Sequence, residues 1–389
     1  MSVTISEAVK YIGVDDKTID LFESQYVVPH GVSYNSYLIF DEKVALMDTV
    51  DTRGVEQWEK NLLAALDGRK VDYLVVSHLE PDHAGSIGRL VELFPEVTLV
   101  GNAKTFHMLP QFFDELPVDE NHKITVAEGE SLSLGTHTLN FYMAPMVHWP
   151  EVMVTYESSE KILFSADGFG KFGALDYEDP EGWACEARRY YFNIVGKYGA
   201  PVQALLKKAA GLDIQKICAL HGPILTENLE YYIGKYQLWS TYTPEDEGIF
   251  IAYCSLHGNT EKAAKKLAEI LEAKGAPKVA ISDLSRDDMA ECIEDAFRYD
   301  RLVLAAPTYD GGVMPVMADF INLLKMKAYQ KRKVAFIENG SWAPMAAKLM
   351  KEQMSAMKDI EIVDEHVTIK SAFKQSDVAA LEALAGKLL

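Results

Sequence analysis

The sequence has few cysteines, and none of them lie close together. Cys185, Cys218, Cys254 and Cys292 form no CxxC pair, which excludes a zinc ribbon, a rubredoxin-type iron site and a disulfide framework. Long apolar runs are also absent, because no stretch approaches the ~20 apolar residues of a membrane span. The first twenty residues lack the basic flank and apolar run of a targeting signal. We therefore expect a protein of the reducing cytoplasm that does not span a membrane.

Positive charge is also scarce. Lys and Arg number 38 against 58 Asp and Glu, which gives a formal net charge of −20. This is the wrong sign for binding a phosphate backbone or an anionic membrane surface, so nucleic acid is not expected as a partner. The 389 residues are 48% hydrophobic and 25% charged, which suits a globular protein of two domains or more at about 100–200 residues each.

A polar, acidic stretch at residues 240–248 follows a helical segment and precedes an apolar strand, and it predicts domains at 1–244 and 247–389. The first domain has strand-like runs at 36–40, 43–48, 71–77, 97–100, 139–143, 152–157, 161–165 and 216–220, with helical patterns at 53–66 and 85–93. The second alternates strands at 249–253, 278–282, 301–305 and 333–338 with helices at 260–274, 289–297, 315–325 and 343–357. That alternation predicts a doubly wound parallel sheet.

Four potential metal ligands follow one apolar run in the first domain. Residues 71–77 lead directly into His78, Glu80, Asp82 and His83, on a loop that Pro81 stops from continuing as a strand. For a lone His or Glu, a solvated polar loop would be the better interpretation. Four potential ligands within six residues favour a metal site instead.

Three further candidates also follow apolar runs. His148 comes after 141–147, Asp167 after 162–166 and His221 after 217–220. Each alone is compatible with an ordinary core or cap residue. If the strand ends converge on one rim of a sheet, however, these side chains gather around the first cluster. The set contains four His, one Glu and two Asp with no thiolate, and three carboxylates favour iron over zinc without excluding zinc.

The second domain carries a candidate phosphate cradle. The strand at 249–253 leads into Ser255 and the segment His257, Gly258, Asn259 and Thr260, at the start of a helix. Hydroxyls, an amide and free backbone N–H groups at a helix N-terminus suit a phosphate monoester. The loop lacks the GKS/T ending of a nucleotide triphosphatase and the GxGxxG of a dinucleotide fold, which disfavours ATP, NAD and FAD.

Two more strand ends add glycines and aromatic residues, which suit a planar ring. The residues of these two loops are Pro307, Thr308, Tyr309, Asp310, Gly311 and Gly312, and Asn339, Gly340, Ser341 and Trp342. Together with the first loop, they resemble the loops of a flavodoxin with bound FMN.

Both sets of motifs resemble the flavodiiron proteins, also called A-type flavoproteins, and the resemblance covers nearly the whole chain. It implies an N-terminal metallo-β-lactamase-like αββα sandwich and a C-terminal flavodoxin-like doubly wound parallel sheet. The cofactors it implies are FMN and two non-haem iron ions. By the same resemblance, His78, Glu80 and His148 hold one iron, Asp82, His83 and His221 hold the other, and Asp167 bridges them.

The resemblance also suggests residues outside the ligand set. Asp48 matches an acidic residue common in this fold and is expected to support the ligands, and Tyr190 and Tyr191 are candidate hydrogen-bond donors. Family members often carry a His after a Phe near the N-terminus, whereas this chain has Glu23 there. Whether Glu23 or His30 acts near the metals is left open.

The implied activity is reduction of dioxygen to water, of nitric oxide to nitrous oxide, or of both. Electrons would come from a separate carrier such as rubredoxin, and the chain would form a head-to-tail homodimer or a tetramer. One alternative is a zinc-dependent hydrolase of the glyoxalase or lactamase type fused to a flavodoxin module. Another is a flavin electron carrier whose first domain holds no metal.

Overall fold

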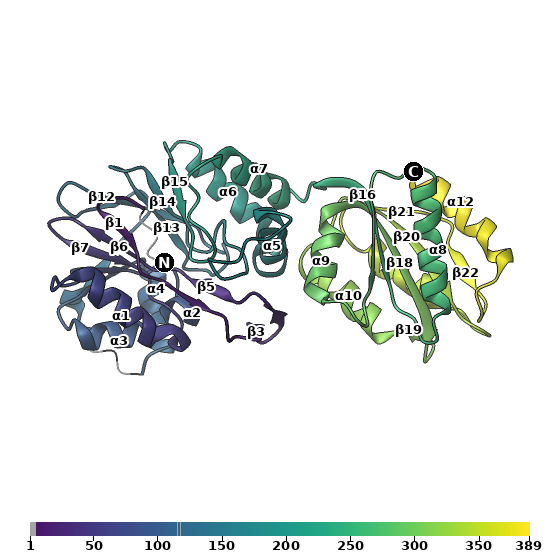
Figure 1. Cartoon of the computed structure of the whole chain (residues 1–389), viewed down its shortest axis with the longest axis horizontal. Helices are drawn as coiled ribbons and strands as arrows, with labels where there is room; N and C mark the ends of the chain where they lie inside the picture. Colours follow the sequence, from purple (N-terminus) through teal and green to yellow (C-terminus); the bar gives the residue numbers. More distant parts are fainter. Residues whose placement is uncertain (1–4, 115, 117) are drawn as a thin grey trace. The chain divides into compact units, whose positions relative to one another are not determined.

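The computed structural model describes residues 5–389 except positions 115 and 117, and these fall into two compact units (Figure 1). The N-terminal unit comprises the described residues up to Tyr191 and also Tyr198–Gln237, and the C-terminal unit comprises Phe192–Lys197 and Leu238–Leu389. Phe192 stacks on Phe297 with ring centroids 4.2 Å apart, so this short segment packs with the C-terminal unit. The predicted domains at 1–244 and 247–389 do not assign Phe192–Lys197 to the C-terminal unit. These domain boundaries stay a prediction.

Two mixed sheets form the N-terminal unit. The first has the strand order β1 (Val9–Tyr11), β6 (Tyr37–Phe40), β7 (Val44–Met47), β8 (Tyr73–Val75), β9 (Thr98–Gly101) and β10 (Lys123–Thr125). The second has the order β11 (Ser131–Ser133), β12 (Thr138–Met143), β13 (Met153–Glu157), β14 (Ile162–Phe164) and β15 (Lys216–Cys218). Two small ribbons pair β2 (Val14–Asp16) with β5 (Val32–Tyr34) and β3 (Leu21–Phe22) with β4 (Tyr26–Val27).

The two sheets pack face to face on a shared apolar core, because alternate residues of each strand point inward. Ile39, Met47 and Val75 from the first sheet meet Phe141 and Phe164 from the second. Helices α1 (Val55–Leu66) and α3 (Ile87–Leu93) lie on one outer side, and α6 (Gly199–Ala209) and α7 (Leu229–Ser240) on the other (Figure 1). The predicted αββα sandwich is confirmed.

The C-terminal unit is built on one sheet of parallel strands. Its order is β17 (Val279–Asp283), β16 (Asp246–Tyr253), β18 (Tyr299–Tyr309), β20 (Arg332–Asn339) and β21 (Ile360–Ile362), with β22 (Val367–Ile369) also on β20 and the short β19 (Gly312–Val313) antiparallel to β18. Helices α8 (Asn259–Ala273) and α12 (Val378–Leu388) cover one face, and α9 (Met289–Arg298) and α10 (Pro315–Met326) the other (Figure 1). Helix α11 spans Ala346–Ser355. The predicted doubly wound sheet is confirmed.

The structure differs from the sequence patterns at two places next to the candidate ligands. The strand predicted at 139–143 is present as β12, but the apolar run that continues to residue 147 leaves the strand after Met143, and the residues up to 152 form turns. The loop expected around Pro81 is a short helix, α2 (Pro81–Ala84), because proline is well tolerated at the first helical position, where its missing N–H has no partner to lose. The sequence patterns also give no indication of the small N-terminal ribbons, of α5 (Trp183–Tyr190) or of α12.

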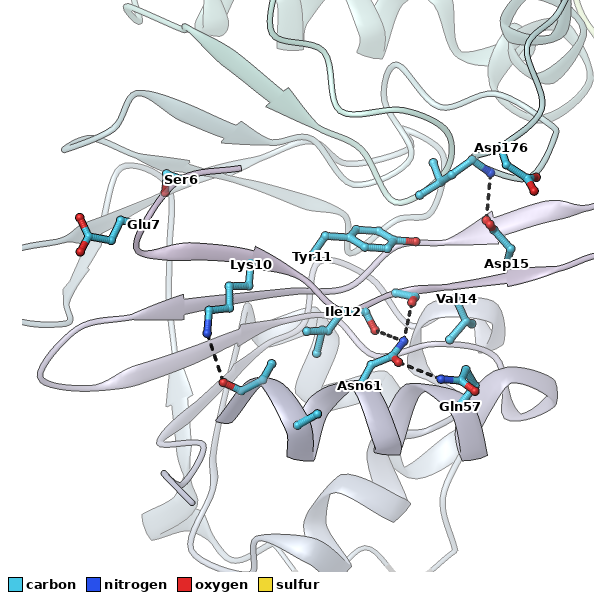
Figure 2. A pocket seen from close by; sticks show the side chains of 14 residues that line it. Ser6, Glu7, Lys10, Tyr11, Ile12, Val14, Asp15, Gln57, Asn61 and Asp176 are labelled. Atoms are coloured by element: carbon cyan, nitrogen blue, oxygen red, sulfur yellow. Dashed lines mark hydrogen bonds between the residues drawn. The ribbon is translucent and has the colours of Figure 1, made fainter. Parts of the chain in front are cut away.

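A cavity of about 900 Å³ lies between the β1–β2 segment and α1 (Figure 2). The Asn61 side chain spans this region by donating to the carbonyls of Ile12 and Gly13 at 3.3 and 2.9 Å, and Lys10 donates to the Ala65 carbonyl (Figure 2). None of the seven candidate ligands lines it. The cavity is therefore separate from the metal chemistry.

His137 provides a pH-dependent contact in this unit. Its Nδ1 lies 2.9 Å from Asp41 Oδ2 and its Nε2 3.5 Å from Glu160 Oε1. Partial burial lowers the pKa of His137, but Asp41, Glu157 and Glu160 outweigh it and leave the pKa raised. A raised pKa gives stability that is present below the unfolded-state value of about 6.5 and lost as the pH rises through the folded-state value.

We predict that His137→Gln lowers the free energy of unfolding at pH 6 by about 0.2–1 kcal/mol, the range for a partly exposed ion pair, and less at pH 9. Thermal unfolding of the variant and the wild type at both pH values measures this. His107→Gln, at an exposed position of α4 (Ala103–Met108), is the control and should show no such pH dependence. A larger loss at pH 9 than at pH 6 would contradict the assignment.

Candidate metal centre and flavin site

The seven candidate ligands follow strands of both sheets and meet at one place. His78 and Glu80 lie in the loop after β8, and Asp82 and His83 lie in α2 directly behind Pro81. His148 lies in the turn between β12 and β13, Asp167 follows β14 and His221 follows β15, so the ligands come from both sheets. All of them are buried except Glu80, which is half-buried.

Four of these side chains form the first half-site, which consists of His78, Glu80, His148 and one oxygen of Asp167. His148 Nε2 lies 2.9 Å from Glu80 Oε2 and 3.0 Å from Asp167 Oδ2. His78 Nε2 lies 3.3 Å from the same Asp167 oxygen. The potential ligand atoms of all four residues lie within 4.8 Å of one another, so they face one common point.

The second half-site consists of Asp82, His83, His221 and the other oxygen of Asp167. Asp82 Oδ2 lies 3.2 Å from the Nε2 atoms of both His83 and His221, which are 3.1 Å apart. His83 Nε2 lies 3.3 Å from Asp167 Oδ1. Asp167 therefore presents Oδ2 to the first half-site and Oδ1 to the second, which is the geometry that a bridging ligand requires.

The donor atoms suit a pair of transition-metal ions. Several buried atoms here make no hydrogen bond within the described chain, among them both ring nitrogens of His78, both carboxylate oxygens of Asp82 and Asp167 Oδ1. Buried polar atoms in native proteins nearly always have a partner, and metal ions would supply one at these positions. A set of imidazoles and carboxylates without thiolate fits iron and also zinc.

The electrostatics agree with a site made for cations. Burial lowers the pKa of His148, but hydrogen bonds to Asp167 and Glu80 raise it to about 10. His78 behaves in the same way, because Asp167 and Glu80 raise its pKa against the effect of burial. For Asp167, burial raises the pKa, but the surrounding histidines hold it well below its usual range. The cluster thus stabilises positive charge on and between its histidines.

Outer contacts fix the orientation of the ligands. His221 Nδ1 lies 2.7 Å from the Ser33 carbonyl, which directs Nε2 toward the metal position. The Asp48 carboxylate accepts hydrogen bonds from the Ser77 backbone N–H at 2.7 Å and from its hydroxyl at 2.6 Å, so it holds the residue before His78. Asp48 lies where the sequence interpretation expects support for the ligands, one residue after β7.

Aromatic rings surround His221. The centroid distances from its ring are 5.5 Å to Phe22, 6.1 Å to Tyr34 and 5.4 Å to Tyr190. The Tyr190 hydroxyl is buried and makes no hydrogen bond to the described residues, whereas the ring of Tyr191 packs on Tyr236 at 5.1 Å. Phe22, Ser33 and Tyr34 come from the small N-terminal ribbons, and no sequence motif marks them as part of the site.

Glu23 and His30 have different surroundings. Burial and the charge of Glu80 raise the pKa of Glu23 to about 7, with His148 opposing them, which places Glu23 beside the first half-site. The ring of His30 instead stacks on Tyr177 with centroids 3.7 Å apart. Of these two residues, Glu23 is the one next to the ligands.

The C-terminal unit has a cavity of about 590 Å³ at the carboxyl ends of β16, β18 and β20. This is where parallel α/β sheets bind ligands. Most residues of the three predicted loops line it, whereas Gly258, Tyr309 and Gly312 do not. The residues from the prediction that line it are Ser255, His257, Asn259, Thr260, Pro307, Thr308, Asp310, Gly311, Asn339, Gly340, Ser341 and Trp342.

The sequence interpretation missed Leu256, Ala343, Ser371 and Ala372, which also line this cavity. Ser371 and Ala372 follow β22, a short strand that the sequence patterns do not predict. The Asn339 side chain donates to the Ser371 carbonyl at 2.9 Å, so this fourth loop is held against the third.

The features of the cavity fit a flavin mononucleotide. The Ser255 hydroxyl is buried and makes no hydrogen bond to the described residues, and it lies in the loop that leads into the N-terminus of α8, where helix N–H groups favour a phosphate. The Thr308 hydroxyl accepts hydrogen bonds from the backbone N–H groups of Met345 and Ala346 and so holds two loops together. Trp342 is 93% exposed, so its ring is available to cover a planar ligand.

The fold and the two sites define a two-domain protein, with a lactamase-like domain that carries a dinuclear metal site and a flavodoxin-like domain. A family model described as "ODP family beta lactamase" matches residues 32–222, and a flavodoxin-domain model matches residues 250–380. A Moorella thermoacetica protein named nitric oxide reductase is 32% identical over 376 residues, which covers 93% of this chain and 92% of the relative.

Solved structures agree over the whole chain. The rubredoxin oxygen:oxidoreductase of Desulfovibrio gigas has a TM-score of 0.92 and 26% identity, covering 100% of this chain and 98% of that one. The flavodiiron protein of Giardia intestinalis also has a TM-score of 0.92, with 23% identity and coverage of 100% and 96%, which supports the fold. The chain belongs to the flavodiiron protein family, and it is an oxidoreductase of that type. The family's cofactors, FMN and two non-haem irons, match its two sites.

No helix in the described part of the chain is long and apolar enough to cross a membrane.

We predict that the metal content separates the roles of the ligands. Asp167→Ala removes the carboxylate that faces both half-sites, so it should bring bound iron to well below one ion per chain. His221→Ala affects the second half-site alone and should leave about one. Iron analysis after anaerobic loading and desalting measures this. Equal iron content in the two variants would contradict the bridging geometry.

For the flavin site, we predict that Gly340→Ala weakens FMN binding. A Cβ at Gly340 would lie 2.8 Å from the Cα atom of Pro344, so the loop would have to move. Gly386→Ala, in α12 with open space around the added Cβ, is the matched control. Fluorescence titration with FMN should show a dissociation constant raised at least tenfold for the first variant and unchanged for the second. An unchanged value for both would mean that the loop at Gly340 does not hold the flavin.

Proposed function

We propose that this protein reduces dioxygen to water, nitric oxide to nitrous oxide, or both, at two irons held by the two half-sites. In this proposal FMN in the C-terminal unit relays electrons that arrive from a separate carrier such as rubredoxin. The observation that carries the proposal is Asp167, whose two carboxylate oxygens face two different sets of ligands. A mononuclear site would not require this arrangement.

The electron balance supports the pairing of the two sites. When bound, reduced FMN and two ferrous ions supply four electrons, which with four protons convert one dioxygen into two waters. Two electrons and two protons convert two nitric oxide molecules into one nitrous oxide and one water. The seven ligands would hold the metals, and aromatic side chains around His221 would limit the access of water.

Tyr190 is our candidate for a hydrogen bond to the substrate. Its hydroxyl is fully buried beside His221, and it makes no hydrogen bond to the described residues. A donor held in a dry site toward developing negative charge stabilises that charge without reorganisation. In the same proposal, Asp48 acts through Ser77 to keep His78 in place.

The relatives support the substrates and the donor. The Desulfovibrio gigas relative is named for rubredoxin and oxygen, and the Moorella thermoacetica relative for nitric oxide. An external donor is also consistent with the absence of any CxxC pair in the sequence. We include in the proposal a head-to-tail homodimer and a cytoplasmic location. The zinc hydrolase alternative does not explain the flavodoxin unit, because hydrolysis needs no electron transfer.

The test uses protein loaded with iron and FMN and reduced without oxygen. We expect reduced rubredoxin to sustain consumption of dioxygen, nitric oxide or both at gas electrodes, with little hydrogen peroxide and with nitrous oxide as the product from nitric oxide. The ratio of the two rates identifies the preferred gas. Asp167→Ala, loaded with FMN, is the control and should accept electrons without consuming either gas. A fully loaded wild type that consumes neither gas would refute the proposal.

A further inference from the structure

A buried carboxylate outside the ligand set lies against the first half-site. Glu151 is 1% exposed and precedes β13, three residues after the ligand His148. Its Oε1 accepts a hydrogen bond of 2.9 Å from the backbone N–H of Leu79. Leu79 is the residue between the ligands His78 and Glu80.

This hydrogen bond connects the two segments that carry the ligands of the first half-site. One segment follows β8 and holds His78 and Glu80, and the other lies between β12 and β13 and holds His148. These segments come from different sheets. A backbone hydrogen bond of 3.0 Å from the Met153 N–H to the Ser77 carbonyl joins them just before His78. The Glu151 side chain adds a second connection, between the ligands His78 and Glu80.

Glu151 is itself held from a third direction. Its backbone carbonyl accepts a hydrogen bond of 2.6 Å from the Asn102 side chain. Asn102 caps α4, because its side-chain oxygen accepts hydrogen bonds from the backbone N–H groups of Lys104 and Thr105. Glu151 is therefore fixed to the end of the first sheet, and its side chain has little freedom to move away from Leu79.

A second buried glutamate, at the end of β13, shows what a purely structural carboxylate looks like here. Glu157 is 0% exposed, and its two oxygens accept hydrogen bonds from the backbone N–H groups of Ser159 and Glu160 at 2.8 and 2.7 Å. In Glu151 only Oε1 is used, while Oε2 is buried without a hydrogen bond to the described residues. A carboxylate buried for a single hydrogen bond is a costly way to stabilise a loop, which indicates a role tied to its position.

We propose that Glu151 is a positioning residue for the first half-site, which sets the spacing between His148 and the pair His78 and Glu80. The inference rests on the proposed di-iron function. Groups that orient metal ligands typically change metal affinity by about 10–100-fold when they are mutated. Without the Glu151 carboxylate, the first half-site should bind its metal more weakly, while the second half-site keeps its own.

The test compares Glu151→Leu, Glu151→Gln and the matched control Glu157→Gln. Metal-free proteins are titrated with Fe(II) under anaerobic conditions against a competing chelator. After desalting, we expect about two irons per chain for the wild type and for Glu157→Gln, and about one for Glu151→Leu, with affinity for the missing iron lowered about 10–100-fold. Glu151→Gln retains an oxygen acceptor for Leu79 and should restore most of the lost affinity.

A spectroscopic readout separates positioning from general destabilisation. Two irons bridged by Asp167 would be spin-coupled when half-reduced, so we expect an electron paramagnetic resonance signal from the coupled pair in the wild type and in Glu157→Gln, and none in Glu151→Leu. The proposal is overturned if Glu151→Leu binds two irons with wild-type affinity. It is also overturned if Glu157→Gln loses as much iron as Glu151→Leu, or if the iron affinity of Glu151→Gln is as low as that of Glu151→Leu. A wild type that fails to bind two irons would count against the proposed function instead.

Discussion

The two oxygens of the Asp167 carboxylate organise the N-terminal site. One oxygen lies 3.0 Å from His148 Nε2, and the other lies 3.3 Å from His83 Nε2. Because a carboxylate is small and planar, this contact fixes how far apart the two ligand sets are. A buried, negatively charged Asp167 is stable only among cations. In the metal-free chain, the charge and hydrogen bonds of nearby histidines outweigh burial and hold the pKa of Asp167 well below its usual range, and two metal ions would stabilise its negative charge in the loaded enzyme.

The αββα sandwich brings histidines to both oxygens of Asp167, because strands of both sheets end at the same place. Ligands from the first sheet, His78 and His83, meet His148, Asp167 and His221 from the second. Two residues beside the site, Asp48 and Ala166, have positive φ values of 54° and 50°. Such conformations cost energy in residues other than glycine, and they occur preferentially at functional sites. In the C-terminal unit the cavity lies at the carboxyl ends of the parallel strands, which is the usual ligand site of such sheets.

The seven candidate ligands could be proposed from sequence because His78, His148, Asp167 and His221 each directly follow an apolar run. His78, Glu80, Asp82 and His83 form a local motif, and the sequence also indicates where Asp167 and His221 lie relative to their strands. It does not give the distances, because they depend on how two sheets pack. The strand predicted at 139–143 is present, but it ends five residues before His148, because apolar residues 144–147 continue the hydrophobic pattern through a turn. Phe22, Ser33, Tyr34 and Glu151 could not be found, because nothing local in the sequence reports their contacts.

The central claim is that two irons lie side by side with Asp167 between them, and anomalous diffraction at the iron edge from crystals of the loaded protein tests it directly. The account predicts two peaks about 3.5–4 Å apart. One should lie among His78, Glu80 and His148, the other among Asp82, His83 and His221, with one oxygen of Asp167 on each. A single peak, a signal at the zinc edge instead, or an Asp167 that binds only one ion would contradict it.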